Sequence, residues 1–171
     1  QGSQKIGMGK EMSENFAEAK EVFEEVDDAL GFNLSKVMWE GSDYDITLTS
    51  NAQPALMACG LAVYRVLIKL TNKKLPELAD YICGHSLGEY TSMTVADVFS
   101  LKECARLLRL RGDAMQQAVP LNQGAMAVFI GADIEITKKI IKEVASMGVC
   151  DIGNDNADGQ VVISGDKLAV D

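Results

Sequence analysis

The 171 residues carry 16 basic and 25 acidic side chains, a net charge of −9, and 47% of the residues are hydrophobic. A chain of this length can bury one good core, and its acidic balance argues against a nucleic-acid partner, which would need a basic surface. Four separated cysteines and a single histidine argue against a structural zinc site and indicate reduced thiols in a cytoplasmic compartment.

The first part of the chain is predicted to be helical. Apolar residues at helical spacing predict a helix over residues 13–30, with Gly31 as its stop and an acidic face in solvent. A second, short helix is predicted over 34–40. Residues 42–49 follow as a predicted loop.

Residues 51–70 give the strongest helix prediction. They are apolar nearly all round, which indicates a buried helix, and Pro54 is expected in its first turn. The longest apolar run, over residues 52–64, is too short to span a bilayer. No signal-peptide pattern opens the sequence, so we expect no association with a membrane.

The centre of the sequence is the stretch Gly-His-Ser-Leu-Gly-Glu-Tyr, at residues 84–90. Residues 78–83 before it predict a strand that enters a buried sheet, and residues 91–96 after it predict a short helix. Strand, Gly-x-Ser-x-Gly and helix in this order are typical of the nucleophile elbow. Gly84 and Gly88 would allow the strand and helix to approach, and Ser86 would be held in strained backbone geometry with its hydroxyl exposed.

The elbow predicts an acyl-transfer or hydrolytic centre, against the alternative of a glycine-rich turn with a solvent-facing serine. The Leu87 N–H would point to a developing oxyanion at the positive end of a helix. The Ser86 hydroxyl needs a general base. His85 is the only histidine, but neighbouring side chains diverge on a tight turn, so we expect a partly buried residue that shapes the elbow. The base must then come from outside this sequence.

A capping box at residues 100–103 predicts a helix that runs to about residue 118. Arg111 lies on this helix, and its guanidinium could hold a carboxylate in a planar, bidentate pair. Arg106 and Arg109, each within one or two turns of it, are interpreted as surface charges.

Residues 120–124 read as a linker, with a subdomain boundary near Asn122. The pattern then changes to alternating strands and helices: strand 125–130, helix 134–147, strand 149–152, turn 154–159 and strand 160–164. Asn154 and Asn156 are sufficiently explained as turn formers. Residues 165–171 resemble the first turn of a further helix.

Residues 84–90 closely resemble the active-site motif of the malonyl-CoA:acyl carrier protein transacylases. Further stretches are similar to the same family in the same order: Gln1-Gly2-Ser3-Gln4, Gln53-Pro54-Ala55-Leu56, Arg111-Gly112-x-x-Met115-Gln116, and Gly159 to Gly165.

The resemblance implies an α/β fold with two parts. Residues 1–121 would belong to an α/β-hydrolase-like catalytic subdomain, and residues 122–171 would begin an inserted, ferredoxin-like small subdomain that is only partly present. Both ends of the sequence read as truncations, with a strand expected before Gln1 and somewhat under half of the enzyme expected after Asp171.

The resemblance also implies an activity. Malonyl-CoA would acylate Ser86, and the phosphopantetheine thiol of an acyl carrier protein would then take the malonyl group, in fatty acid synthesis. Coenzyme A thioester would be a substrate, with no permanently bound cofactor, and we expect a cytoplasmic monomer. Because carrier proteins are acidic, their docking surface would be a local basic patch or lie outside this sequence.

Site roles follow from the same resemblance. The backbone N–H groups of Leu87 and Gln1 would form the oxyanion hole, and Arg111 would bind the malonyl carboxylate. Gln53 and His85 would line the substrate site. The general-base histidine would lie outside this sequence.

Three alternatives stay open. The first is a serine hydrolase or thioesterase of α/β-hydrolase type, which would have no need for a carboxylate anchor such as Arg111. The second is the acyltransferase domain of a polyketide synthase, which shares these motifs. The third is a carrier-binding module without catalysis.

Overall fold

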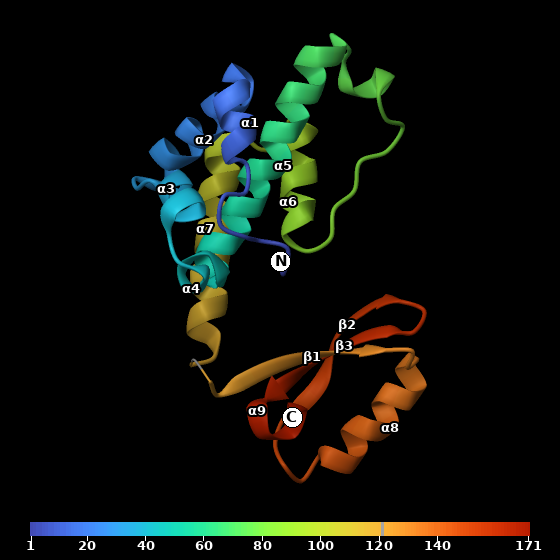
Figure 1. Ribbon diagram of the computed structural model, residues 1–171. Coiled ribbons are helices and arrows are strands. Elements are labelled where there is room, and N and C mark those ends of the chain that lie inside the picture. The colour runs from blue at the N-terminus through green and yellow to red at the C-terminus, as the bar shows by residue number, and fades with distance from the viewer. Residues whose placement is uncertain (121) are drawn as a thin grey trace. The chain divides into compact units, whose positions relative to one another are not determined.

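The computed structural model describes residues 1–120 and 122–171, in two compact units made of residues 1–116 and 117–171. Helices build the first unit, and a three-stranded sheet with helices builds the second (Figure 1). The protein is therefore of mixed α and β structure.

The regular elements described in the first unit are all helices. Its elements are α1 (Lys10–Asn15), α2 (Ala17–Leu30), α3 (Leu34–Glu40), α4 (Asp43–Thr47), α5 (Thr49–Thr71), the 3-10 helix η1 (Leu75–Glu77), α6 (Leu87–Val95) and α7 (Leu101–Ala118), whose last two residues belong to the second unit.

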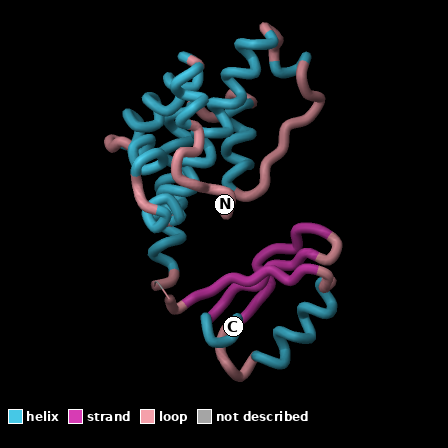
Figure 2. Tube along the Cα trace, viewed as in Figure 1, coloured by secondary structure: helices cyan, strands magenta, loops and turns pink. Residues whose placement is uncertain are grey.

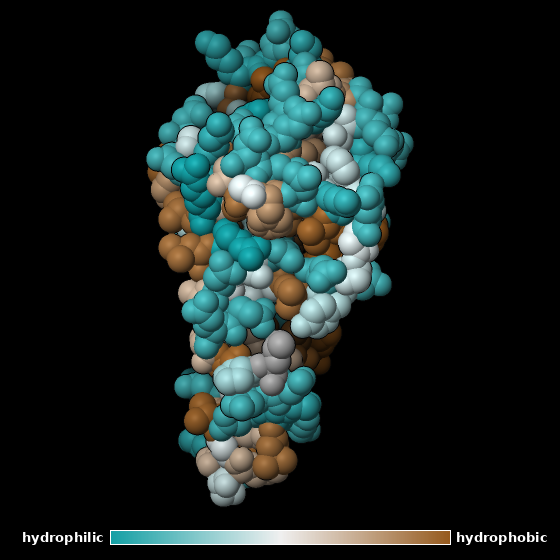
Figure 3. All heavy atoms as spheres, turned by 90° about the vertical axis from the view of Figure 1, so that its left-hand side faces the viewer, coloured by the Kyte–Doolittle hydropathy of each residue, from teal (hydrophilic) through white to brown (hydrophobic). Residues whose placement is uncertain are grey.

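Helix α5 is the central element of this unit, with α2 and α6 packed against it (Figure 1). Val22, Phe23 and Val26 of α2 share one buried cluster with Ala58 and other apolar residues of α5. The opposite face of α2 carries the exposed acidic residues Glu21, Glu24 and Asp28. Hydrophilic residues cover much of the face shown in Figure 3.

The helix predicted over residues 13–30 is two helices. Phe16 is extended, with φ −133° and ψ 120°, and serves both as the end of α1 and as the N-cap of α2. Its N–H donates to the Met12 carbonyl, and its own carbonyl accepts from Ala19 and Lys20. Gly31 ends α2 in the left-handed region, with φ 73°, as predicted.

The predicted loop at residues 42–49 contains the short helix α4. Ser42 caps it, because its hydroxyl accepts from the Asp45 N–H over 3.1 Å. A serine followed by acidic residues is an N-cap signal that the prediction missed.

The predicted central helix is confirmed, but it is buried nearly all round only in its first half, and farther along one face is exposed. Ala52, Ala55 and Ala58 lie in the core, whereas Val63 and Leu67 farther along α5 are exposed. Pro54 lies inside the helix instead of in its first turn, because α5 begins at Thr49.

By length and composition alone α5 could cross a membrane. This evidence is weak, because the core helix of a soluble protein passes the same test and the first half of α5 is packed inside the unit.

The strand predicted over residues 78–83 is not formed. Residues 80–84 run as an exposed segment without regular secondary structure. A strand needs a neighbour for its backbone hydrogen bonds, and the described part of the first unit has no strand beside this segment. The helix after the elbow is confirmed as α6.

Helix α7 begins at the predicted capping box. The Glu103 N–H donates to the Ser100 hydroxyl over 3.2 Å, and the Ser100 N–H donates to the Glu103 carboxylate over 2.8 Å. Gly112 of α7 lies against the start of α5, where a Cβ would be 2.5 Å from the Ser50 Cα. The two helices therefore touch backbone to backbone at this point.

The interpretation of Arg106 and Arg109 as surface charges is correct for the exposed Arg106, whereas Arg109 is half-buried, and both also make contacts within the first unit. Arg106 Nε donates to the Ala29 carbonyl over 3.1 Å, at the end of α2. Arg109 Nη1 donates to Asn51 over 2.7 Å, and its guanidinium lies 5.2 Å from the centre of the Phe32 ring. Both arginines tie α7 to other parts of the first unit.

The second unit consists of β1 (Gly124–Ile130), α8 (Ile134–Val144), β2 (Cys150–Ala157), β3 (Gln160–Asp166) and α9 (Lys167–Val170). The sheet has the order β1-β3-β2, and both pairings are antiparallel (Figure 2). Val161, Val162 and Ile163 of the central strand are buried.

The predicted elements of this unit are all present, with different bounds. Strand β2 extends through most of the predicted turn, which is reduced to Asp158 and Gly159. Asn154 and Asn156 are thus strand residues, and the interpretation as turn formers is wrong. Helix α8 ends three residues earlier than predicted. Leu121, in the predicted linker, lies outside the described residues.

Candidate active site

The turn into α6 holds Ser86 in a backbone conformation that few side chains adopt. Ser86 has φ 53° and ψ −115°, and such strained geometry is concentrated at functional sites. The His85 carbonyl accepts from the Gly88 N–H over 2.8 Å. The Ser86 carbonyl accepts from the Glu89 N–H over 3.1 Å. The predicted strain is therefore present, and it sets the serine at the tip of a closed turn.

The two elbow glycines, Gly84 and Gly88, differ in the space that a side chain would have. A Cβ on Gly84 would lie 2.0 Å from the carbonyl carbon of Gly88, so any side chain there would collide with the backbone of α6. A Cβ on Gly88 would meet nothing within 4 Å outside its own helix. The expectation that close approach requires both glycines is correct for Gly84 and wrong for Gly88.

Leu87 is the first residue of α6, and its side chain is buried. The first N–H groups of a helix have no partner inside the helix, and they lie at its positive end. The buried side chain of Leu87 fixes this N–H beside Ser86. There the N–H can stabilise the oxyanion that forms when Ser86 attacks a carbonyl group.

Arg111 of α7 reaches the elbow. Its Nη2 donates to the Ser86 Oγ over 3.0 Å, and its guanidinium carbon lies 5.8 Å from the centre of the Tyr90 ring. A carboxylate bound by this guanidinium would therefore lie next to the serine oxygen.

Gln53 of α5 holds the other side of the guanidinium. Its Oε1 accepts from Arg111 Nη1, and the Gln53 side chain is completely buried. Its Nε2 donates to the Thr49 hydroxyl over 2.8 Å and approaches the Met115 sulfur at 3.3 Å. Every polar atom of this buried amide thus has a partner, as burial requires.

Gln1 joins the same group of residues. Its Oε1 accepts from the Thr49 hydroxyl over 3.0 Å. The sequence-predicted residues Gln1, Gln53, Arg111 and Ser86 are therefore connected by hydrogen bonds through Thr49. Sequence reasoning missed Thr49, because it placed residues 42–49 in a loop, whereas α5 begins at Thr49 and brings its hydroxyl one turn before Gln53.

His85 does not fit the expectation of a partly buried residue, because it is exposed. The reason is the position of residues 80–86, which run along the surface of the first unit instead of entering a sheet.

A separate cavity lies beside the segment that leads into the elbow. It is lined by Ile82, Cys83, Gly84, Glu89, Ser92, Met93, Ala96 and Val98. Cys83 is exposed and unpaired.

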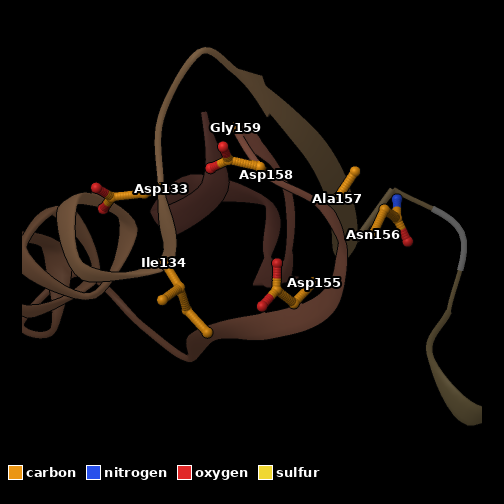
Figure 4. A pocket seen from close by; sticks show the side chains of 7 residues that line it. All are labelled: Asp133, Ile134, Asp155, Asn156, Ala157, Asp158 and Gly159. Carbon is orange, nitrogen blue, oxygen red and sulfur yellow. The ribbon is translucent and has the colours of Figure 1, made fainter.

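The second unit has a separate pocket at the start of α8 and the turn between β2 and β3 (Figure 4). It is lined by Asp133, Ile134 and residues 155–159. Asp133 is used as the N-cap of α8, since it accepts from the Ile136 N–H over 2.8 Å. Within the part of the chain that the structure describes, no group of three or more His, Cys, Asp or Glu side chains could hold a metal ion.

Comparison with known proteins gives consistent similarities over the whole sequence. The model of the acyl transferase domain family matches residues 1–171. Among curated proteins, the malonyl CoA-acyl carrier protein transacylase of Bacillus subtilis strain 168 is 41% identical over 172 residues, covering 100% of this chain and 53% of the relative. The corresponding protein of Escherichia coli K12 is 39% identical, with 54% of its length covered.

Solved structures agree with the sequence matches. The crystal structure of acyl-carrier-protein-S-malonyltransferase from Bartonella henselae has a TM-score of 0.92 and 50% identity, covering 99% of this chain and 54% of that one. A complex described as a type II PKS acyl-carrier protein with its malonyl-transacylase has a TM-score of 0.89 and 39% identity, with 99% and 54% covered. The chain spans about half the length of the relatives it matches.

Proposed function

The chain belongs to the acyl transferase domain family, and from that premise we propose that its protein transfers malonyl groups from coenzyme A to an acyl carrier protein in fatty acid biosynthesis. The observation that carries the proposal is the hydrogen bond between Arg111 Nη2 and Ser86 Oγ, 3.0 Å long. It supports the proposal because a guanidinium can bind a carboxylate and a serine hydroxyl can attack a thioester, and malonyl-CoA has both groups.

The proposed reaction has two half-reactions. Ser86 Oγ attacks the malonyl thioester carbon, and the N–H groups of Leu87 and Gln1 stabilise the oxyanion of the tetrahedral intermediate. The general base takes the Ser86 proton, the carbon–sulfur bond breaks, the coenzyme A thiolate leaves and takes up that proton, and malonyl-Ser86 remains. The carrier-protein thiol attacks this ester, the intermediate collapses, and Ser86 recovers its proton.

Arg111 would hold the malonyl carboxylate through both steps, while Gln53 fixes the guanidinium and His85 lines the approach to the serine. We propose that the general base comes from a part of the protein outside these 171 residues. Support comes from His85, the single histidine of the sequence, which adjoins Ser86 on a tight turn and is exposed. The enzyme needs no permanently bound cofactor in this scheme, and we propose that it works as a cytoplasmic monomer.

We also propose the finer architecture that the family resemblance implies. Residues 1–121 are assigned to an α/β-hydrolase-like subdomain that carries the nucleophile elbow, and residues 122–171 to the start of a ferredoxin-like one. The order β1-α8-β2-β3-α9, with β3 central in the sheet, supports the second assignment, because a ferredoxin-like fold runs β-α-β-β-α-β.

A serine hydrolase is the second candidate, and the elbow alone would fit it equally well. Arg111 favours transfer of malonyl groups, because a simple hydrolase does not need a buried amide to hold a cation at its nucleophile. An acyltransferase domain of a polyketide synthase would carry out the same chemistry with another carrier. A binding module without catalysis would have no use for the strain at Ser86.

The test measures whether the carrier-protein thiol or water accepts the malonyl group. The full-length protein is incubated with radiolabelled malonyl-CoA and holo-acyl carrier protein, and malonyl-carrier and free malonate are quantified over time. We expect the carrier to receive the label much faster than water does, and apo-carrier without phosphopantetheine to receive none. Malonate production at one rate with or without the carrier would make the protein a hydrolase.

A further inference from the structure

We propose that Thr49 is a positioning residue that fixes the orientation of the Gln53 amide and, through it, the Arg111 guanidinium. The inference rests on the proposed function, because it concerns how the site selects a substrate with a carboxylate. The Thr49 hydroxyl donates to Gln1 and accepts from Gln53, which in turn accepts from Arg111, so Thr49 acts on the guanidinium through Gln53.

The direction of each hydrogen bond follows from the groups involved. A guanidinium can only donate, so the oxygen of the Gln53 amide, and not its nitrogen, must face Arg111. The amide nitrogen then needs acceptors on the other side. Thr49 Oγ1 provides one at 2.8 Å, and the Met115 sulfur at 3.3 Å is a weak acceptor.

The proton of the Thr49 hydroxyl also has a hydrogen-bond acceptor. It is donated to the Gln1 Oε1 over 3.0 Å, which leaves the hydroxyl oxygen to accept from Gln53. Gln1 and Gln53 therefore hold the hydroxyl in one direction, and the hydroxyl holds the Gln53 amide in the one orientation that suits Arg111. An amide turned by 180° would bring N–H groups against the guanidinium and leave its oxygen beside the Met115 sulfur.

A role in helix capping does not account for Thr49. It is the first residue of α5, the N-cap is Leu48, and no side chain caps this helix end. The Thr49 hydroxyl instead faces Gln53 and Gln1. The Thr49 hydroxyl therefore serves its hydrogen bonds to site residues and not the capping of α5.

The experiment uses the full-length protein and compares Thr49→Val, which keeps the shape and removes the hydroxyl, with Thr49→Ser, which keeps the hydroxyl. Thr71→Val is the matched control on the same helix, because the Thr71 hydroxyl donates only to the Leu67 carbonyl in the hydrogen bonds of the structure. For each variant kcat and KM are measured with malonyl-CoA and with acetyl-CoA, which lacks the carboxylate.

For Thr49→Val we expect the ratio of kcat/KM for malonyl-CoA to that for acetyl-CoA to fall by about tenfold, mainly through the KM of malonyl-CoA. Thr49→Ser and Thr71→Val should keep the ratio of the wild type. In an Arg111→Ala background, Thr49→Val should change the ratio by less than about twofold, because the effect passes through the guanidinium. An equal loss for both substrates, or the same change in ratio without Arg111, would overturn the inference.

A second readout does not depend on the substrate. Hydrogen exchange of the Gln53 side-chain amide, followed by NMR, should be faster in Thr49→Val than in the wild type or in Thr71→Val. Unchanged exchange would show that Thr49 does not hold the amide. A wild-type enzyme that fails to prefer malonyl-CoA would instead contradict the proposed function, while the exchange measurement would still test the contact.

Discussion

Arg111 and Ser86, 25 positions apart in the sequence, meet through a hydrogen bond of 3.0 Å between Nη2 and Oγ. This closeness restricts the acyl groups that can use both residues at once. In a malonyl thioester a single methylene group separates the carboxylate from the reacting carbonyl carbon, so a short distance between anchor and nucleophile fits this substrate. A longer diacid would need the two residues farther apart.

Ser86→Ala should abolish formation of the acyl-enzyme. The hydroxyl at the tip of the elbow is the proposed attacking group, and alanine has no oxygen to acylate. Mass spectrometry of the full-length protein after incubation with malonyl-CoA should place the added mass on the peptide that contains Ser86. Label on Cys83, which is also exposed, or labelling that persists in Ser86→Ala, would refute this assignment.

Arg111→Ala should lower kcat/KM for malonyl-CoA steeply and leave acetyl-CoA nearly unaffected or improved. A charge-assisted, bidentate pair is worth roughly 1.5–3 kcal/mol per hydrogen bond, and a guanidinium left without its carboxylate penalises the neutral substrate. Arg111→Lys should rescue only in part, because an ammonium group lacks the planar fork.

The measurement is steady-state kinetics with both thioesters for the wild type and the two variants. A fall by the same factor for both substrates would mean that Arg111 supports the structure and does not read the carboxylate.

Gly84→Ala should destabilise the protein and inactivate it, whereas Gly88→Ala should be tolerated. The added methyl group at residue 84 would lie 2.0 Å from the backbone of α6, and such overpacking costs about 1–3 kcal/mol or more. At residue 88 the methyl group has space, and alanine in a helix is favoured over glycine by about 0.5–1 kcal/mol.

Thermal unfolding of the two full-length variants compares these effects directly. Equal melting temperatures for Gly84→Ala and Gly88→Ala would contradict the steric argument.

Cys59 should resist alkylation. Burial raises the pKa of its thiol to about 11, and the thiolate is the reactive form. In the unfolded chain a cysteine has a pKa of about 8.5. Between that pH and 11 the unfolded state therefore binds fewer protons than the folded state. Ionisation of Cys59 therefore favours unfolding as the pH rises through this window.

At pH 8 we expect iodoacetamide to modify the exposed Cys83 at least about tenfold faster than Cys59. Peptide mass spectrometry of the full-length protein at successive times gives both rates, and alkylation of Cys59 should accelerate up to about pH 11. Similar rates at pH 8 would show that the Cys59 thiol is accessible and ionised.

The sequence predicted most helices correctly because their signals are local. The capping box at Ser100 and the glycine at residue 31 each act within one turn, and both were found where predicted. The break at Phe16 was missed, because nothing in the apolar spacing of residues 13–30 distinguishes one helix from two. A strand is different, since it depends on a neighbour: residues 78–83 have the composition of a strand without a pairing partner among the described residues.

Some residues of the candidate site could be predicted from the sequence alone, and others could not. The strain at Ser86 follows from the elbow pattern itself, whereas Arg111 could be separated from Arg106 and Arg109 only through the family resemblance. Thr49 could not be found from the sequence, because its role depends on Gln1, 48 positions away, and on the amide of a residue one turn along α5. Such roles depend on contacts between distant parts of the sequence, which a local sequence pattern cannot predict.

The backbone contact between Gly112 and Ser50 has a practical consequence for redesign. Because a Cβ at residue 112 would lie 2.5 Å from the Ser50 Cα, the joint between α5 and α7 cannot be widened or narrowed by exchanging side chains there. A library that seeks other acyl groups should therefore keep Gly112 fixed and vary side chains that contact Gln53 or Arg111, beginning with Met115 and Tyr90. Selected variants would then change the surroundings of Arg111 while α5 and α7 keep their spacing.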